Sequence, residues 1–261
     1  SAAQGILTTD TRPKLASTSF TTANGSQANI SGFAKGSGMI RPNMTTLLAY
    51  VFADAKIETP LLENFLDSAV NNSFNRITVD GDTSTNDCCM LVATGKGSLV
   101  ITDADSEAAR QFQSELNAVF EQLATDLIRD AEGASKFITI EVNEGASEQE
   151  CLAVAYTVAE SPLVKTAFFA SDPNWGRILA AIGRAGLSDL DIESVTVALG
   201  DTLLVSKGAV DAAYSERAGQ SEMDKDAIRV QINLGRGKAR TRVWTSDLSS
   251  EYVRINADYR S

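Results

Sequence analysis

The spacing of apolar side chains alternates along the chain between the period of a helix and that of a strand. Apolar positions recur every three or four residues within residues 59–70, 106–130, 147–161 and 175–184, as in helices with one buried face. Apolar and polar residues alternate within residues 138–142, 195–199 and 228–234, which predicts strands. Helices and strands mixed in this way, without a strict strand–helix–strand repeat, predict layered α+β packing.

Signals at the helix ends support this interpretation. Thr59 followed by Pro60 predicts a helix with Thr59 as its N-cap and Pro60 at its first position. Ser147 and Glu150 have the spacing of a capping box, and Pro162 ends the helix that follows. Gly186 ends the helix at residues 175–184.

The 261 residues are enough for one large domain or two small ones. The polar stretches at residues 143–150 and 214–225 resemble a linker more than any other segment does, but neither predicts a domain boundary. The three cysteines, two of them adjacent, favour reduced thiols over a disulfide framework. No apolar run approaches the ~20 residues of a membrane span, and the first residues lack a secretory pattern.

Composition narrows the possible chemistry. The chain has no histidine, which excludes a Ser-His-Asp triad, a Cys-His dyad and histidine-ligated metal sites within it. The usual general base near neutral pH is therefore missing, so a carboxylate, a lysine or another amine must take that role. The net charge of −11 argues against nucleic-acid binding and leaves small-molecule substrates open.

Residues 35–50, KGSGMIRPNMTTLLAY, are the most informative stretch. Its glycines and proline indicate an irregular loop, and the local pattern then predicts a helix capped by Thr45 or Thr46. A phosphate-binding loop is disfavoured because the Gly-x-x-x-x-Gly-Lys-Ser/Thr pattern is absent.

Three other stretches carry polar residues with a structural and a functional interpretation. Asp80 and Asp82 resemble a cation loop, but the calcium-loop spacing fails and turn chemistry explains them as well. Glu132 lies where a long helix ends before Gly133 and a strand begins, a place where side chains often line a cleft. Residues 172–177, DPNWGR, have the pattern of the capped start of a helix. Residues 256–261 form an unusually polar tail.

Taken together, these stretches closely resemble one family, the ornithine acetyltransferases of arginine biosynthesis, also called bifunctional glutamate N-acetyltransferase/ornithine acetyltransferases. The matching pieces occur in family order, at residues 7–11, 35–48, 79–87, 129–137, 161–166, 172–177 and 256–261. The resemblance implies a layered αββα-type arrangement, similar to N-terminal nucleophile hydrolases but with its own topology. It also implies a heterotetramer of two α and two β chains, cytoplasmic in bacteria and organellar in fungi and plants.

Members of this family cut themselves before a threonine. The resemblance places the cut between Thr45 and Thr46, so residues 1–45 correspond to the end of an α subunit and 46–261 to a β subunit. Thr45 stands where the family has alanine. Cleavage would free the α-amino group of Thr46, whose reference pKa of ~7.7–8.0 suits a general base for its own hydroxyl. A chain without histidine then retains a base for covalent acyl transfer.

The resemblance implies a ping-pong reaction in which Thr46 accepts the acetyl group of N-acetylornithine and passes it to glutamate. No cofactor or metal is expected, and acetyl-CoA is a second donor in bifunctional members. The family's substrate contacts fall on Thr9, Lys35, Thr46, Glu132, Asn256 and Ser261. Lys35 would pair with a substrate carboxylate and Glu132 with a substrate ammonium group.

The match begins partway into the family, and the Thr-Gly pair that forms the family's oxyanion hole lies in the portion that this sequence lacks. Two other hypotheses therefore stay open. One is a non-catalytic subunit that needs a partner chain for the oxyanion hole. The other is an N-terminal-nucleophile amidase or aminopeptidase, in which water replaces glutamate as the acceptor.

Overall fold

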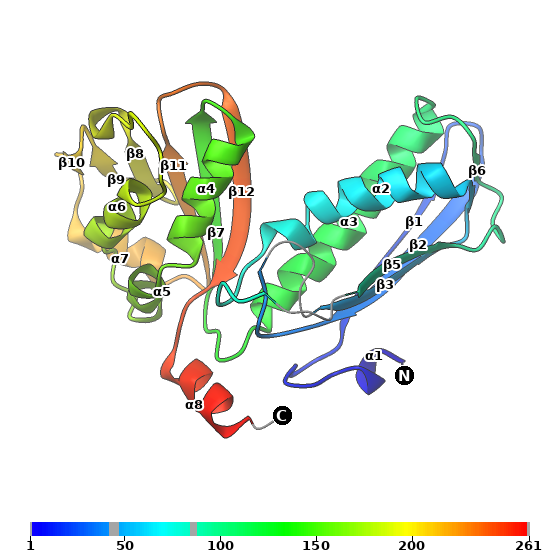
Figure 1. The fold of residues 1–261 in the computed structure, drawn as a ribbon, viewed down its shortest axis with the longest axis horizontal. Helices are drawn as coiled ribbons and strands as arrows, with labels where there is room; N and C mark the ends of the chain where they lie inside the picture. Colours follow the sequence, from blue (N-terminus) through cyan, green and yellow to red (C-terminus); the bar gives the residue numbers. More distant parts are fainter. Residues whose placement is uncertain (1, 42–46, 84–87, 260–261) are drawn as a thin grey trace. The chain divides into compact units, whose positions relative to one another are not determined.

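The computed structural model describes residues 2–41, 47–83 and 88–259. Its elements form two compact units, Ser1–Ala131 and Glu132–Ser261, and each has its own sheet and helices (Figure 1). The division follows the long helix α3 (Glu107–Arg129) directly, at a point with no Pro-rich or Ser-rich stretch to mark it in the sequence. The predicted α+β class is confirmed, and the two-domain alternative describes the chain.

The N-terminal unit is built on a four-stranded sheet in the order β1 (Lys14–Thr21), β2 (Gln27–Lys35), β3 (Leu48–Ala53) and β5 (Cys88–Ala93). β2 is antiparallel to both neighbours, whereas β3 and β5 are parallel. The short strands β4 (Lys56–Ile57) and β6 (Val100–Ile101) pair separately. The helical elements of this unit are α1 (Ala2–Gly5), α2 (Thr59–Asn71), the 3-10 turn η1 (Phe74–Arg76) and α3.

The core of this unit lies between the sheet and α3. Helix α3 packs on β1 and β2, and α2 packs on α3 (Figure 1). The Phe112 ring lies between Phe20 and Phe65, with centroids 6.5 and 5.1 Å away. Gly32 on β2 lets the sheet and α3 lie close together, because a Cβ at this position would lie only 3.2 Å from Leu123 Cδ1 of α3.

The C-terminal unit has a six-stranded sheet in the order β10 (Ala209–Val210), β9 (Thr202–Ser206), β8 (Thr196–Leu199), β11 (Ala227–Asn233), β7 (Phe137–Gly145) and β12 (Ala239–Ser246). β11 and β7 are parallel, and the other pairs are antiparallel. Its helical elements are α4 (Glu148–Ala159), α5 (Pro162–Phe169), α6 (Trp175–Gly183), η2 (Ile192–Ser194), α7 (Glu216–Met223) and α8 (Ser250–Asp258).

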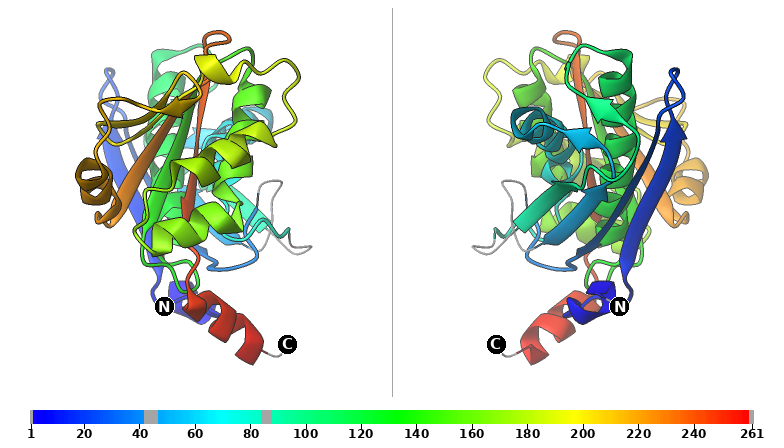
Figure 2. Two further views of the ribbon diagram at one scale, coloured as in Figure 1. Left: turned by 90° about the vertical axis from the view of Figure 1, so that its left-hand side faces the viewer. Right: turned by 90° about the vertical axis from the view of Figure 1, so that its right-hand side faces the viewer.

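One face of this sheet forms the core of the C-terminal unit. Alternate residues of β7 and β11, among them Ile140 and Val230, pack against the buried side of α4 and α6. Figures 1 and 2 show α4, α5 and α6 on the same side of the sheet. Each unit thus combines a sheet with a layer of helices, as the layered α+β prediction requires.

Most of the predicted helices and strands are confirmed, with ends within a few residues. Ser106 caps α3 by accepting the Ala109 N–H, and Ser147 caps α4 by accepting the Glu150 N–H. The N-cap of α2 is Glu58 and not Thr59, so this helix starts one residue earlier than predicted. Among the helices that the structure describes, none has the length and apolarity needed to cross a membrane.

The structure differs from the sequence-based expectation at the residues after Thr46 and at several helices. The apolar run after Thr46 forms strand β3 and not a helix, because Ala49, Val51 and Ala53 alternate with more exposed residues and pair with β2 and β5. Helices α1, α5, α7 and α8 were not predicted from the sequence. Pro162 follows α4 and lies at the start of α5, the polar stretch at residues 214–225 contains α7, and residues 256–258 of the polar tail belong to α8.

Candidate functional site

Two residues predicted to bind substrate, Thr9 and Lys35, belong to one polar cluster in the N-terminal unit. Thr9 lies in the loop before β1, and its hydroxyl shares a hydrogen bond of 2.6 Å with the Ser37 hydroxyl. Lys35 is the last residue of β2, and its Nζ donates to Thr8 Oγ1 at 3.3 Å. Both contacts join the loop before β1 to the end of β2. Lys35 is only partly buried, so its ammonium group is accessible to an anionic ligand.

A buried charged network lies directly beside this cluster. Lys14 Nζ is fully buried and donates to Asp10 Oδ1, to Asp130 Oδ2 at 2.5 Å and to the Gly36 carbonyl at 3.4 Å. Asp10 also accepts the Gly36 N–H at 2.7 Å and the Thr8 N–H at 3.3 Å. Asp130 accepts the N–H and the hydroxyl of Thr11.

The network keeps Asp10 charged although it is buried. Burial alone raises the pKa of Asp10, but the Gly36 N–H and the Lys14 ammonium group together outweigh it and hold the pKa below its usual value. No role was predicted for Lys14 or Asp10 from the sequence. The available signal was the alternation of β1, which places Lys14 on the same buried face as Ala16 and Phe20.

Asp80, which resembled a cation ligand in the sequence, instead holds the Gly-rich loop. Its carboxylate accepts the Met39 N–H at 2.7 Å and the Ile40 N–H at 3.1 Å, and the Ile40 carbonyl accepts the Val79 N–H. Met39 has a φ of +53°, an uncommon conformation for a residue other than glycine. Within the described residues, no group of three or more Asp, Glu or Cys side chains has the arrangement of a metal site.

Two further predicted residues, Glu132 and Asn256, meet in the C-terminal unit. Asn256 on α8 donates through Nδ2 to Glu132 Oε2 at 2.7 Å, across 124 positions of sequence. The Glu132 residue is only partly buried, and the other oxygen of its carboxylate has no hydrogen-bond partner among the residues that the structure describes. Glu132 is thus oriented by a neutral amide and not by a cationic side chain.

The position of α8 depends on Gly133. The Ser249 hydroxyl donates to the Gly133 carbonyl at 2.6 Å and caps α8 by accepting the Glu251 and Tyr252 N–H groups. Gly133 has a φ of +67°, and a Cβ there would lie 2.5 Å from the Tyr252 backbone nitrogen. Only glycine therefore allows the start of α8 to lie against the residue that follows Glu132.

The predicted nucleophile Thr46, its neighbour Thr45 and the terminal Ser261 lie outside the described residues. Their predicted roles remain predictions.

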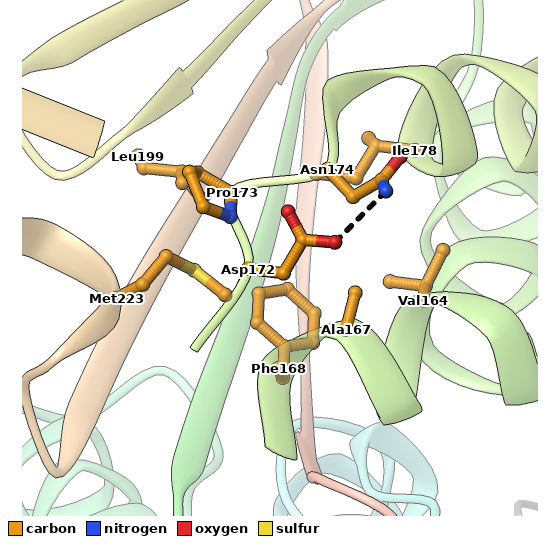
Figure 3. Close-up of a pocket in the computed structure, with 9 residues that line it drawn as sticks. All are labelled: Val164, Ala167, Phe168, Asp172, Pro173, Asn174, Ile178, Leu199 and Met223. Atoms are coloured by element: carbon orange, nitrogen blue, oxygen red, sulfur yellow. Dashed lines mark hydrogen bonds between the residues drawn. The ribbon is translucent and has the colours of Figure 1, made fainter. Parts of the chain in front are cut away.

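Residues 172–177 have the structural role that their local pattern indicates. Asn174 Nδ2 donates to Asp172 Oδ2 at 2.9 Å (Figure 3). The Asn174 side chain also caps α6 by accepting the Arg177 N–H. Asp172, Pro173 and Asn174 line a small cavity whose other lining residues are apolar, among them Phe168 and Met223. The cavity is too narrow for a water molecule, so it has no room for an amino-acid ligand.

Curated relatives match this chain along its whole length. The chain is 53% identical over 261 residues to the arginine biosynthesis bifunctional protein ArgJ of Pseudomonas fluorescens and 54% identical over 261 residues to that of Psychrobacter arcticus. Each match covers 100% of this chain and 64% of the relative. The chain therefore spans less than two thirds of the length of these relatives.

A solved structure and a family model agree with these relatives. The crystal structure of ArgJ from Bacillus halodurans matches with a TM-score of 0.74 and 37% identity, over 79% of this chain and 96% of that chain. The model of the ArgJ family matches residues 1–261. The resemblance seen in the seven sequence stretches is thereby confirmed, and the chain belongs to the ArgJ family.

Proposed function

We propose that the protein carrying this chain is an acetyltransferase of arginine biosynthesis that transfers the acetyl group of N-acetylornithine to glutamate. The observation that carries the proposal is the match of the whole chain to the ArgJ family, together with relatives named as arginine biosynthesis bifunctional proteins. The assignment of substrate residues draws further support from two contacts, Thr9 with Ser37 and Asn256 with Glu132.

The reaction proceeds through an ester of Thr46. The Thr46 hydroxyl attacks the acetyl carbonyl of N-acetylornithine, the amide C–N bond breaks, and the hydroxyl proton passes to the departing amine of ornithine. The neutral α-amine of glutamate then attacks the ester, and Thr46 regains its proton as N-acetylglutamate leaves. One amide replaces another, so the enzyme's task is to orient the reactants and stabilise the oxyanion.

The base for this reaction is the α-amino group that self-cleavage frees on Thr46. This route needs no histidine, in keeping with a chain that has none. The extent of the Bacillus match supports the cleavage point. Since 79% of this chain covers 96% of that solved chain, the solved chain is about as long as residues 46–261.

Charged side chains select an amino-acid substrate. Lys35 pairs with the α-carboxylate, and Thr9 offers a hydroxyl beside it. Glu132 binds the side-chain ammonium group of N-acetylornithine, while Asn256 fixes the orientation of the Glu132 carboxylate. The partial burial of Lys35 and Glu132 supports these roles, because each retains access to a ligand.

Further elements of the proposal concern the rest of the enzyme. Two α and two β chains form a heterotetramer in the bacterial cytoplasm. No metal or cofactor is required, and acetyl-CoA serves as a second acetyl donor. Relatives named bifunctional support this second donor.

An exchange assay tests the proposal. The complete enzyme is incubated with N-acetylornithine and isotopically labelled glutamate, and we expect N-acetylglutamate and ornithine in equal amounts with parallel lines in double-reciprocal plots. Thr46→Ala should abolish the exchange. Acetate released without N-acetylglutamate would instead identify an amidase, and labelled acetyl-CoA as sole donor tests the bifunctional assignment.

A further inference from the structure

The strongest unassigned feature is the buried network of Asp10, Lys14 and Asp130 beside Thr9 and Lys35. The side chains of Asp10 and Lys14 are 0% exposed, and that of Asp130 is 5% exposed. Two carboxylates share one ammonium group, so the network holds one more negative than positive charge. Buried ion pairs often add little stability over apolar residues of similar size, so stability alone does not account for this arrangement.

We propose that Asp10 is a positioning residue that fixes the Lys35 ammonium group and the Thr9 hydroxyl relative to each other for substrate binding. The inference rests on the proposed function, which assigns Thr9 and Lys35 to the substrate. Asp10 does not touch the substrate itself. It acts through the backbone N–H groups of the residues next to Thr9 and Lys35.

Asp10 reaches both segments that carry these side chains. One carboxylate oxygen accepts the N–H of Gly36, the residue after Lys35, and the other accepts the N–H of Thr8, the residue before Thr9. Lys14, bonded to Asp10, donates to the Gly36 carbonyl. The peptide groups on both sides of Gly36 are thus held by the same ion pair.

The conformation of Gly36 explains why its backbone needs the hydrogen bonds from Asp10 and Lys14. Gly36 has a φ of +147°, a region that glycine adopts but other residues rarely do, so the chain there has no side chain of its own to restrict it. Within the described residues, the hydrogen bonds that join the loop before β1 to residues 35–37 without passing through the network are the exposed Lys35–Thr8 contact and the Thr9–Ser37 hydroxyl pair. Errors of about 1 Å in the placement of such binding groups can lower kcat/KM by about 100-fold.

Asp10→Asn is the informative substitution, because it keeps the shape of the side chain. Asparagine can accept at one of the two oxygen positions only. Its NH₂ then faces either the Thr8 N–H or, with the amide reversed, both the Gly36 N–H and Lys14 Nζ. Lys14 keeps Asp130 as its partner, so no buried ammonium group is left without a carboxylate. The net charge of the network changes from −1 to zero.

Asp130→Asn is the matched control. It removes an equally buried charge from the same lysine, yet it leaves both backbone contacts of Asp10 in place. A second control, Val142→Ala, lowers stability through a cavity in the C-terminal unit, where Val142 is fully buried, and touches no part of the network.

The complete enzyme and its variants are compared by steady-state exchange kinetics and by amide hydrogen exchange of residues 35–37. For Asp10→Asn we expect KM for N-acetylornithine to rise at least about tenfold, kcat to change less than about threefold, and amides 35–37 to exchange faster. For both controls we expect KM within about threefold of the wild-type value, whatever the loss of stability.

Three results overturn the proposal: equal rises in KM for Asp10→Asn and Asp130→Asn, faster amide exchange without a change in KM, or a loss confined to kcat. If Asp10→Asn does not fold, Asp10→Glu takes its place, since it keeps the charge beside Lys14 but its extra methylene displaces the carboxylate from the Gly36 and Thr8 N–H groups. An unchanged KM in that variant contradicts the positioning role. The exchange activity of the wild-type enzyme is measured first. If the wild-type enzyme has no exchange activity, the proposed function itself is refuted, and the variants do not test the role of Asp10.

Discussion

Replacing Glu132 by glutamine separates its charge from its shape. Glutamine keeps an oxygen that can accept the Asn256 Nδ2 hydrogen bond, now 2.7 Å long, so the local structure should persist. What disappears is the negative charge, which the proposal assigns to the side-chain ammonium group of N-acetylornithine. The substitution therefore tests a binding role with little risk of unfolding.

The partial burial of Glu132 sets the expected size of the effect. A shielded hydrogen bond to a charged group contributes about 1.5–3 kcal/mol, whereas an ion pair in full contact with solvent contributes less than about 1 kcal/mol. Glu132 lies between these limits, so we expect a loss of about 1–2 kcal/mol. This corresponds to a rise of about 5- to 30-fold in KM for N-acetylornithine.

The assay compares N-acetylornithine with N-acetylnorvaline, which lacks only the side-chain ammonium group. Glu132→Gln should weaken the use of N-acetylornithine and leave the poor use of N-acetylnorvaline nearly unchanged, so that the two substrates become more alike. Glu193→Gln, which removes an exposed carboxylate elsewhere in the same unit, is the control. Equal losses for both substrates would show that Glu132 does not recognise the ammonium group.

Three other predictions follow from single contacts. Asp80→Ala removes both N–H contacts that hold the Gly-rich loop, so self-cleavage followed on denaturing gels should slow at least about tenfold, and an unchanged rate would exclude this role. Gly133→Ala should lower the free energy of unfolding in urea by about 1–3 kcal/mol, because its φ is positive and a Cβ meets the α8 backbone; a neutral result would contradict that contact. Burial and the neighbouring Cys88 raise the pKa of Cys89 to about 12, so its alkylation should be slow at pH 8 and rise about tenfold per pH unit to pH 10, as read by peptide mass spectrometry; fast labelling at pH 8 would refute it.

Features fixed by neighbouring residues were predictable from the sequence. The caps at Ser106 and Ser147 are such features, because a side chain bonds to an N–H three residues further along the same helix. The strand after Thr46 shows the limit of this approach. Its short apolar run suits a helix or a strand, and the decision depends on pairing with β2 and β5.

Features that join distant parts of the chain were not predictable from local pattern. Lys14 and Asp130 are 116 positions apart, and nothing near either residue shows that they form an ion pair. Glu132 and Asn256 were named together only because the sequence resembles a family. The structure adds the hydrogen bond between them and the reason for Gly133, which lets α8 approach.

The central claim is that Thr46 becomes an N-terminal residue and carries the acetyl group. Intact-mass spectrometry of the purified enzyme, before and after incubation with N-acetylornithine alone, tests it most directly. We predict two fragments that meet between Thr45 and Thr46, and the addition of one acetyl group to the fragment that begins with Thr46. Glutamate should then remove that group. A chain that stays whole, or an acetyl group on any other residue, would contradict the account.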